Sequence, residues 1–158
     1  MAEAVKEEDR PAEAPHKVDL NGMFRFKVDS KGRMALPAKF RKVLSKDLVV
    51  TRDLTDECLY VFETPDFDKW IDKLFNGKFG GYNDADLVQV GLRRKLKARA
   101  NDVSVDSAGR IMLPAEIRKA VGIDKEVVVV GNTGRFEIWD AERYDKVDED
   151  IDLGLFYS

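Results

Sequence analysis

The sequence predicts a β-rich α+β fold in which two copies of one small unit form a single compact body. Three observations predict it: an internal repeat, the apolar alternation of strands inside each copy, and helical spacing between the copies. Residues 28–42 read VDSKGRMALPAKFRK and residues 105–119 read VDSAGRIMLPAEIRK, so ten of fifteen positions are identical at an offset of 77. Apolar residues at 48–50 and 59–62 have counterparts at 127–129 and 136–139, which indicates that the whole unit is duplicated.

Each copy is expected to begin with a half-buried strand. Apolar side chains at positions 24, 26 and 28 alternate with Arg25 and Lys27, a period of two that is typical of strands. Val103 and Val105 keep the same alternation in the second copy. Further strands are predicted at 33–36, 48–52 and 58–62 in the first copy and at 110–113, 126–131 and 135–139 in the second.

A tight turn and a short helix lie between these strands. Gly32 and Gly109 end the turn sequences Asp-Ser-Lys-Gly and Asp-Ser-Ala-Gly, where a glycine can adopt positive φ. Pro37 and Pro114 are expected at the first helical position, because proline lacks only a donor that is unsatisfied there anyway. The helices are predicted to run to about Leu44 and Val121.

Two helices are predicted between the copies, and a further helix is expected at the C-terminus. Thr64 is expected to cap the first spacer helix, with Pro65 in its first turn, and Asn83 or Asp84 to cap the second. Trp70 belongs to an apolar stripe that packing explains better than a ligand site does. The predicted boundaries are an acidic, disordered arm at 1–19, the first repeat at 20–64, the helical spacer at 65–99, the second repeat at 100–144 and a C-terminal tail at 145–158.

Charge is distributed unevenly along the chain. The 27 Lys and Arg against 30 Asp and Glu give a formal net charge of −3. Residues 25–46 nevertheless contain eight basic residues and one acid, and residues 91–119 contain eight basic residues and three acids. Such segments favour binding of an anionic partner. Judged by charge alone, two solvent-exposed basic faces without a partner are an equally good interpretation.

The residue inventory argues against an enzyme. The only histidine, His16, lies in the predicted arm, which leaves no histidine for a catalytic triad or a metal site. The single cysteine, Cys58, cannot form an intrachain disulfide and is expected to be inert. Asp29 and Asp106 could be imagined as paired catalytic carboxylates, but in a turn they are expected to fix the loop by accepting backbone N–H groups. We therefore predict no catalytic residue, metal, cofactor, small-molecule substrate or membrane association.

Arginine recurs at the same place in both copies. Arg33 and Arg110 directly follow the turn glycine, and arginine binds phosphate or guanine in a bidentate manner. An ion pair with Asp29 or Asp106 is the alternative, and it is compatible with DNA binding because it can preorganise the arginine. Further cations are expected nearby: Arg25, Lys27 and Lys31 around the first loop, and Lys97 and Arg99 before the second.

These segments resemble a known family. DSKGRMALPAKFR and DSAGRIMLPAEIR are similar to the two signature segments of MraZ, a bacterial regulator family related to AbrB-type swapped-hairpin domains of the double-psi type. The resemblance covers roughly residues 20–144 and implies ring-like homo-oligomers that bind short repeated boxes of double-stranded DNA. These boxes lie in the promoter of the cell-division and cell-wall gene cluster that begins with the regulator's own gene. The implied DNA-contacting loop residues are Asp29, Lys31 and Arg33 in the first copy and Asp106 and Arg110 in the second.

The chain departs from the family pattern at a few places. Phe26 stands where the family often has histidine, Ala108 matches Lys31, and residues 1–19 precede the usual family start. We predict a sequence-specific DNA-binding regulator in the cytoplasm, associated with the nucleoid. An antitoxin-like interaction module, a ring-forming scaffold and an enzyme with an unfamiliar site are the alternatives. The predicted DNA-binding residues are Lys31, Arg33, Arg110, Arg25 and Lys27, with Asp29, Gly32, Asp106 and Gly109 positioning the loops.

The duplication leads to two expectations about assembly. Swapped hairpins complete their fold by pairing with a second copy, and here the partner copy can lie in the same chain. Each chain then presents two similar loops, which we expect to act as two nearly equivalent DNA-binding heads.

Overall fold

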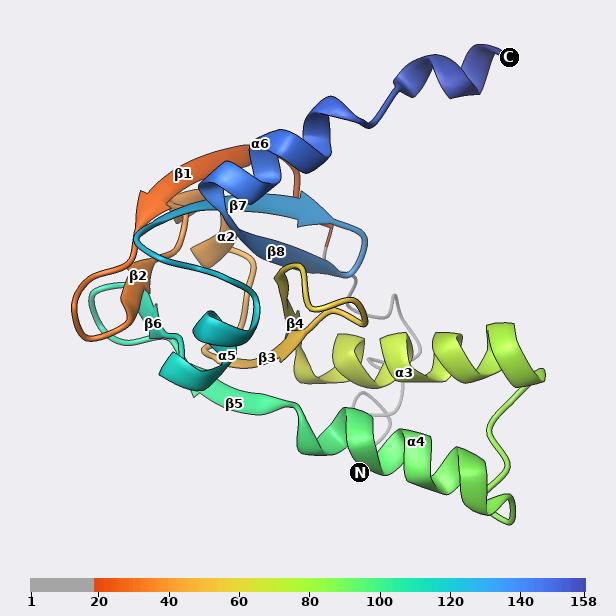
Figure 1. Cartoon of the computed structure of the whole chain (residues 1–158). Coiled ribbons are helices and arrows are strands. Elements are labelled where there is room, and N and C mark those ends of the chain that lie inside the picture. Colours follow the sequence, from red (N-terminus) through yellow and green to blue (C-terminus); the bar gives the residue numbers. More distant parts are fainter. Residues whose placement is uncertain (1–18) are drawn as a thin grey trace, which may run out of the picture.

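A six-stranded antiparallel sheet forms the centre of the computed structural model, which describes residues 19–158 (Figure 1). The predicted arm lies outside the described residues except for its last position. The strands are β1 (Met23–Lys27), β2 (Arg33–Ala35), β3 (Asp47–Arg52), β4 (Leu59–Glu63), β5 (Asn101–Ser104), β6 (Arg110–Met112), β7 (Glu126–Asn132) and β8 (Arg135–Asp140). The helices are α2 (Ala38–Arg41), α3 (Thr64–Phe79), α4 (Leu87–Ala98), α5 (Ala115–Ala120), α6 (Ala141–Glu149) and the 3-10 helix η1 (Leu153–Tyr157).

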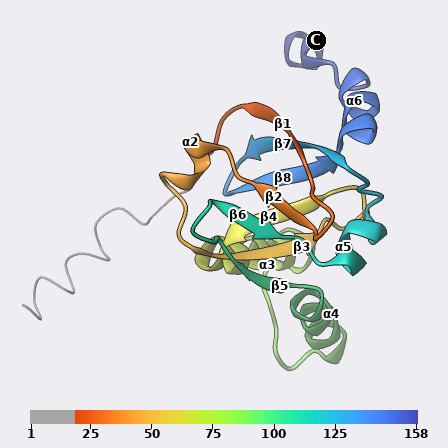
Figure 2. The same ribbon diagram turned by 90° about the vertical axis from the view of Figure 1, so that its left-hand side faces the viewer.

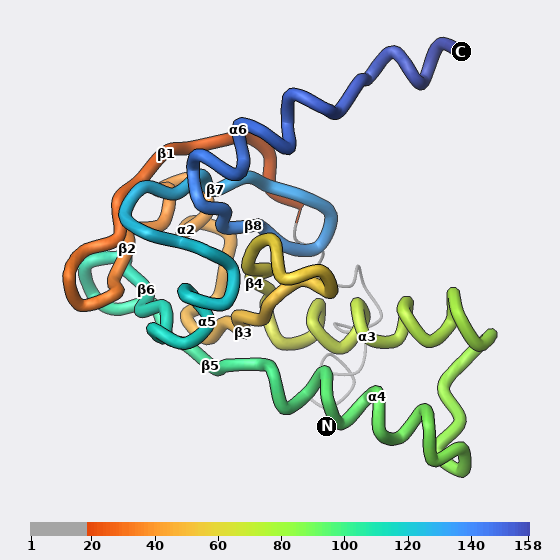
Figure 3. The backbone as a smooth tube through the Cα atoms, viewed as in Figure 1, coloured from red at the N-terminus to blue at the C-terminus, as the bar shows by residue number. Residues whose placement is uncertain are grey.

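The two copies are interleaved rather than set side by side. The strand order β1-β7-β8-β4-β3-β5 places the first strand of each copy against a strand of the other, β1 on β7 and β5 on β3. β4 and β8 join the copies at the centre of the sheet, and β2 pairs with β6 in a separate two-stranded ribbon. The tube in Figure 3 shows how the chain crosses between them. The strands of each copy therefore pair with strands of the other copy in the same chain.

The main core lies between the sheet and the ribbon. Apolar residues that alternate along the strands meet the short helices α2 and α5 on this face, which Figure 2 shows with β2 and β6 in front of the sheet. Phe40 of α2 is fully buried there, 5.4 Å from the Phe136 ring. The largest fully buried side chains of this cluster include Met34, Leu48, Leu59, Ile111, Leu113 and Ile138. The ribbon is therefore held to the sheet by apolar packing.

The opposite face of the sheet carries one helix from each copy. α3 packs on β3 and β4 through Phe67, Ile71 and Phe75, and α6 packs on β7 and β8. Each helix starts directly after the last strand of its copy, so α3 and α6 are structural counterparts. Both predicted spacer helices and the predicted C-terminal helix are present, and within residues 19–158 α4 has no counterpart in the second copy.

Several helix ends differ from those predicted. α2 has four residues and ends at Arg41 instead of running to Leu44. Pro37 and Pro114 occupy the N-cap position, one residue before the helix, because their ψ angles are extended. Thr64, the predicted N-cap of the first spacer helix, is the first residue of α3, and Glu63 occupies the N-cap position. Neither Asn83 nor Asp84 caps α4: the Asp86 carboxylate accepts the Val88 N–H at 2.9 Å.

Two other side chains behave as expected. The Trp70 ring packs at 5.3 Å from the Phe62 ring in the cluster beneath α3, so its stripe serves packing. Cys58 is fully buried beside Val128 and Trp139. Burial raises the pKa of its thiol, so the group stays a protonated thiol at neutral pH rather than the reactive thiolate. No helix within residues 19–158 has the length and apolar character needed to cross a membrane.

Candidate nucleic-acid interface

The ribbon of β2 and β6 places the two repeated arginines on one surface. The register pairs Arg33 with Met112, Met34 with Ile111, and Ala35 with Arg110. Met34 and Ile111 are each 1% exposed and point into the core. Since side chains alternate along a strand, Arg33 and Arg110 point outward from the same face. They are diagonal cross-strand neighbours, whose Cα atoms are typically about 7–8 Å apart.

Each arginine is fixed by the aspartate of its own loop. Asp29 Oδ1 accepts the N–H groups of Lys31 and Arg33, both at 2.9 Å, and Asp29 Oδ2 accepts Arg33 Nε at 2.9 Å. Asp106 repeats this arrangement with the N–H groups of Ala108 and Arg110 at 2.9 Å and Arg110 Nε at 3.1 Å. Sequence identity in the two loops thus produces the same geometry, and Asp29 and Asp106 position the loops in this structure.

The electrostatics favour the charged form of both loop aspartates. The backbone N–H of Arg33, and then its guanidinium, lowers the pKa of Asp29, and Arg110 lowers that of Asp106 in the same way. Within residues 19–158, only Nε of each guanidinium donates to a protein acceptor, so the terminal NH₂ groups have no protein acceptor there. The side chains of Arg33 and Arg110 are 30% and 36% exposed. Their terminal NH₂ groups have the fork geometry that recognises phosphate or guanine.

The loops also anchor each other across the pseudo-symmetric ribbon. Leu113 N–H donates to Gly32 O at 2.8 Å, and Leu36 N–H donates to Gly109 O at 3.0 Å. The glycines have φ of +85° and +77°, a region that favours glycine. The two loops, which the sequence predicts to act as two nearly equivalent DNA-binding heads, are joined into one surface by these cross-copy hydrogen bonds. We call this surface the composite head and define it as residues 29–35 and 106–112.

A second pair of arginines borders the composite head, and the sequence analysis missed it. A Cβ built on Gly109 would collide with the Arg41 side chain, and one built on Gly32 would lie 2.9 Å from an Arg118 NH₂ nitrogen. Each arginine thus lies against the glycine of the other copy's loop. Arg41 also lines a hollow of about 180 Å³ beside Gly109. The internal repeat could have identified this pair, because Arg41 and Arg118 occupy one of its ten identical positions.

The remaining predicted cations lie in different surroundings. Lys31 is exposed at the first loop, and Lys27 lies opposite Glu126 on the neighbouring strand. Arg25 forms an ion pair with Asp145 of α6 at 2.7 Å, which raises the pKa of the guanidinium through that hydrogen bond.

The expectation that Lys97 and Arg99 surround the second loop is wrong. Lys97 Nζ lies 3.4 Å from the Asp68 carboxylate of α3, and Arg93 pairs with Asp72 one helical turn away. Residues four apart share one helix face, so the basic side of α4 matches the acidic side of α3. Arg99 pairs with Asp56 at 3.0 Å in the loop between β3 and β4. Arg93 and Lys97 of the second basic segment therefore pair α4 with α3.

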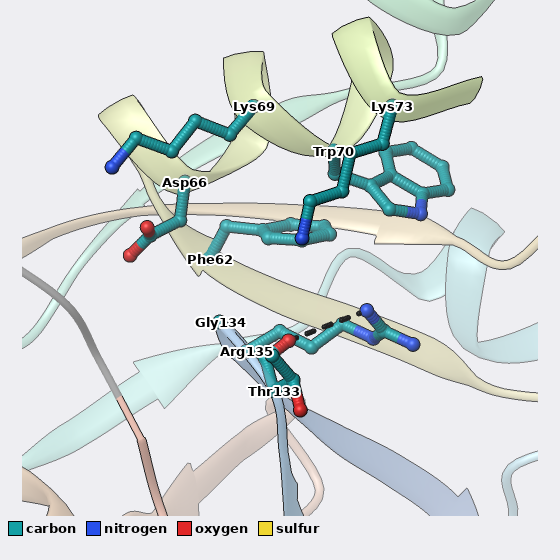
Figure 4. Close-up of a pocket in the computed structure, with 8 residues that line it drawn as sticks. All are labelled: Phe62, Asp66, Lys69, Trp70, Lys73, Thr133, Gly134 and Arg135. Carbon is teal, nitrogen blue, oxygen red and sulfur yellow. Dashed lines mark hydrogen bonds between the residues drawn. The ribbon is translucent and has the colours of Figure 1, made fainter. Parts of the chain in front are cut away.

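A separate cavity of about 290 Å³ lies between α3 and the turn joining β7 to β8 (Figure 4). Lys69, Lys73 and Arg135 bring positive charge to it, and the Arg135 guanidinium lies 4.2 Å from the centre of the Tyr60 ring. Its volume is just below the range of about 300–1,000 Å³ typical of ligand pockets. None of its lining residues belongs to the composite head, so it is a distinct feature of the α3 side.

Comparisons with known proteins match the architecture. The family model described as "MraZ protein, putative antitoxin-like" matches residues 20–79 and 96–156. The chain is similar to three proteins named "Transcriptional regulator MraZ". That of Saccharopolyspora erythraea is 40% identical over 78% of this chain and 82% of its own length. Those of Lachnoclostridium phytofermentans and Micrococcus luteus are 37% and 32% identical, over 83% and 85% of this chain and 92% and 98% of their own lengths.

Proposed function

The chain belongs to the MraZ family, and we propose that it is a transcriptional regulator that binds specific DNA sequences through the composite head. One observation carries the proposal: the register of β2 and β6 sets Arg33 and Arg110 side by side, each held by its aspartate with its terminal NH₂ groups free. Bidentate arginine contacts to guanine are the commonest specific contacts in the major groove, which admits a two-stranded ribbon. Relatives are named as transcriptional regulators, which favours this function over catalysis.

The cations in and around the composite head would contact different parts of the DNA. Arg33 and Arg110 contact base edges or the phosphates beside them, while Lys31 at the loop contacts phosphate. Arg41 and Arg118 border the loops and contact the flanking backbone, which sets the register on the duplex. Arg25 and Lys27 lie on β1, and we retain them as outer phosphate contacts, with Arg25 first having to leave Asp145.

Finer features of the proposal follow from the family resemblance and the strand pairing. We propose that the interleaved repeats are an AbrB-like swapped-hairpin arrangement, with both partners in one chain. The DNA target is a set of short direct repeats in the promoter of the chain's own cell-division and cell-wall cluster. Several chains assemble as a homo-oligomer, which we expect to be a ring, so that neighbouring boxes are bound with avidity. Such a regulator acts in the cytoplasm, at the nucleoid.

Fluorescence anisotropy with a labelled duplex from the upstream region of the chain's own gene tests this function. The salt concentration stays fixed, because protein–DNA affinity depends strongly on it. Arg33→Ala and Arg110→Ala should each weaken specific binding by about 1–3 kcal/mol, or about 5- to 150-fold. Folding stability should change little, since partly exposed ion pairs contribute about 0–1 kcal/mol.

Arg93→Ala is the matched control. It removes the same charge from an arginine that pairs with Asp72 of α3, away from the composite head, and should leave DNA affinity nearly unchanged. If Arg33→Ala and Arg110→Ala bind the duplex as well as the unmodified protein does, the composite head is not the DNA site. If the unmodified protein distinguishes no upstream duplex from random DNA, sequence-specific regulation is refuted and an antitoxin-like interaction role gains support.

A further inference from the structure

The C-terminal segment exposes apolar side chains to an unusual degree. After α6 the chain leaves the sheet, and η1 extends away from the body in Figure 1. Ile151, Leu153, Leu155, Phe156 and Tyr157 are 63–92% exposed. η1 is nevertheless ordered: the Asp152 carboxylate caps it by accepting the Gly154 N–H at 2.8 Å. We call residues 148–157 the tail; its ordered but uncovered apolar surface is typical of an interaction segment.

An apolar groove lies on the helical hairpin of α3 and α4. Its volume is about 360 Å³, and its floor is formed by Leu74, Phe75 and Leu96. Exposed apolar residues stand at its edge: Leu54 is 55%, Phe79 41% and Leu92 45% exposed. A groove of this volume can accept an aromatic and an aliphatic side chain, as interface pockets do for their anchor residues.

The charges of groove and tail are complementary. Lys78, Lys95 and Arg99 line the groove. Arg99 is held by Asp56, but within the described part of the chain no carboxylate lies within ion-pair distance of Lys78 or Lys95. The tail contributes Asp148, Glu149, Asp150 and Asp152, four acids next to its apolar residues. Complementary charge of this kind favours association and fixes orientation.

From these observations we infer that the tail of one chain docks in the α3–α4 groove of a second copy of the same chain. Phe156 and Leu155 fill the groove, and Asp148 and Asp150 approach Lys78 and Lys95. The tail and the groove are different surfaces, so when each chain gives its tail to one neighbour and receives the tail of another, the contact is heterologous, and repetition closes a ring or extends a filament. Two chains that exchange tails with each other would form a closed dimer instead. The inference supplies the interface for the oligomer within the proposed function, but it does not involve the composite head.

A second copy is favoured over the chain's own tail. α6 is held on β7 and β8 by Trp139, Tyr144 and Val147, which fixes where the tail starts. From there the tail runs away from the α3–α4 hairpin in both Figure 1 and Figure 3. Occupation within one chain would require the α6 end and η1 to turn back, whereas a neighbouring chain can approach the tail as it stands.

Light scattering coupled to size-exclusion chromatography of the full chain tests the contact. Leu155→Asp with Phe156→Asp should shift the assembly towards the monomer, raising the apparent dissociation constant at least tenfold, as loss of anchor residues does. Leu92→Asp in the groove should have the same effect. Val43→Asp is the control, because Val43 is 50% exposed but belongs to neither surface. An unchanged mass for the tail and groove variants would overturn the inference.

Charge exchange then tests the pairing itself. Lys78→Glu with Lys95→Glu should weaken association, and adding Asp148→Lys with Asp150→Lys should restore it. Rescue requires that these groups meet, whereas a merely structural effect of either pair would not be reversed by the other. If the second pair weakens association further, the tail does not bind this groove.

Disulfide trapping identifies which chain supplies the tail. Phe156→Cys and Phe79→Cys in one chain leave Cys58 as the only other thiol, and it is fully buried. Oxidation should produce a ladder of linked chains on a denaturing gel. A single chain with an internal disulfide would show that the tail folds back, which overturns the inference.

DNA binding separates this inference from the proposed function. Tail variants should keep their affinity for one isolated box, since the composite head is intact, and should lose the gain provided by an array of boxes. Arg33→Ala should do the opposite, weakening binding to a single box while the oligomer persists.

Discussion

The close approach of the two copies at Gly32 and Gly109 makes a quantitative prediction about glycine substitution. Both glycines have positive φ, so alanine at either position costs about 1–2 kcal/mol in backbone strain. Their surroundings differ, however. A Cβ on Gly32 would lie 2.9 Å from the carbonyl oxygen of Leu113, which is backbone, whereas the three atoms nearest to a Cβ on Gly109 all belong to the Arg41 side chain. The exposed Arg41 side chain can move aside, but the strand at Leu113 cannot move without weakening its hydrogen bond to Gly32 O.

The expected order of stability follows. Gly109→Ala should lower the free energy of unfolding by about 1–2 kcal/mol, the strain alone. Gly32→Ala should lower it by about 2–3 kcal/mol, because a backbone hydrogen bond worth about 0.5–1.5 kcal/mol is lost in addition. For a chain of this size, about 1 kcal/mol corresponds to roughly 3 °C in Tm. The two variants should therefore differ by several degrees although their motifs are nearly identical.

The free energy of unfolding is measured by chemical and thermal unfolding at one protein concentration. Two further alanine variants serve as references. Gly134→Ala has φ of +71° with open space around it and should show strain alone. Gly77→Ala lies in the interior of α3 with no atom within 4 Å of its Cβ, and should stabilise the protein by about 0.4–1 kcal/mol. Equal losses for Gly32→Ala and Gly109→Ala would show that the contact with the Leu113 carbonyl adds no cost at Gly32, which would refute this reasoning.

Two predictions concern solution conditions. The first is the salt dependence of DNA binding. The logarithm of the affinity should fall with the logarithm of the salt concentration at a slope of about −4.5 per bound head, if one phosphate is neutralised by each of Lys31, Arg33, Arg41, Arg110 and Arg118. A slope near zero would show that these cations do not face DNA. Asp29 and Asp106 have lowered pKa values, so their contribution to loop stability is present above the ordinary value of 3.8 and is lost only as pH falls through the lower folded values. In NMR spectra, the backbone amide signals of Lys31 and Ala108 should therefore stay constant from pH 8 to about pH 5 and shift only below pH 3.8. A titration midpoint of these signals at or above pH 3.8 would mean that the two carboxylates do not accept the amide groups.

Strand positions could be predicted because alternation and turn chemistry are local. Each predicted strand is present, and Gly32 and Gly109 have the positive φ expected of them. The loop aspartates bind the N–H groups that their turn position implies. DNA contact by Arg33 and Arg110 stays a prediction, because the structure shows only that both are partly exposed and that each is held by its aspartate.

The remaining features depend on information that one stretch of sequence does not contain. Asn83, Asp84 and Asp86 are all of residue types that cap helices, and residue type alone does not predict that Asp86 caps α4. Lys97 was expected near the second loop because it precedes it in sequence, but the acidic face of α3 pairs with it. The composite head itself depends on pairing β2 with β6 across the copies, a contact separated by 77 positions.

The pairing of β2 with β6 also bears on the kind of DNA repeat that one head distinguishes. Two identical loops related by an approximate two-fold axis would bind a palindrome equally well in both orientations. The copies are not identical, however: Lys31 is matched by Ala108, and the residues opposite Arg110 and Arg33 are Ala35 and Met112, the latter 52% exposed. One arm of the head thus has an additional cation, and the other has a larger apolar side chain. We expect such a head to distinguish the two orientations of its box, and the heterologous contacts proposed above would make repeated heads face the same way. Direct repeats rather than inverted ones are the arrangement that this geometry favours.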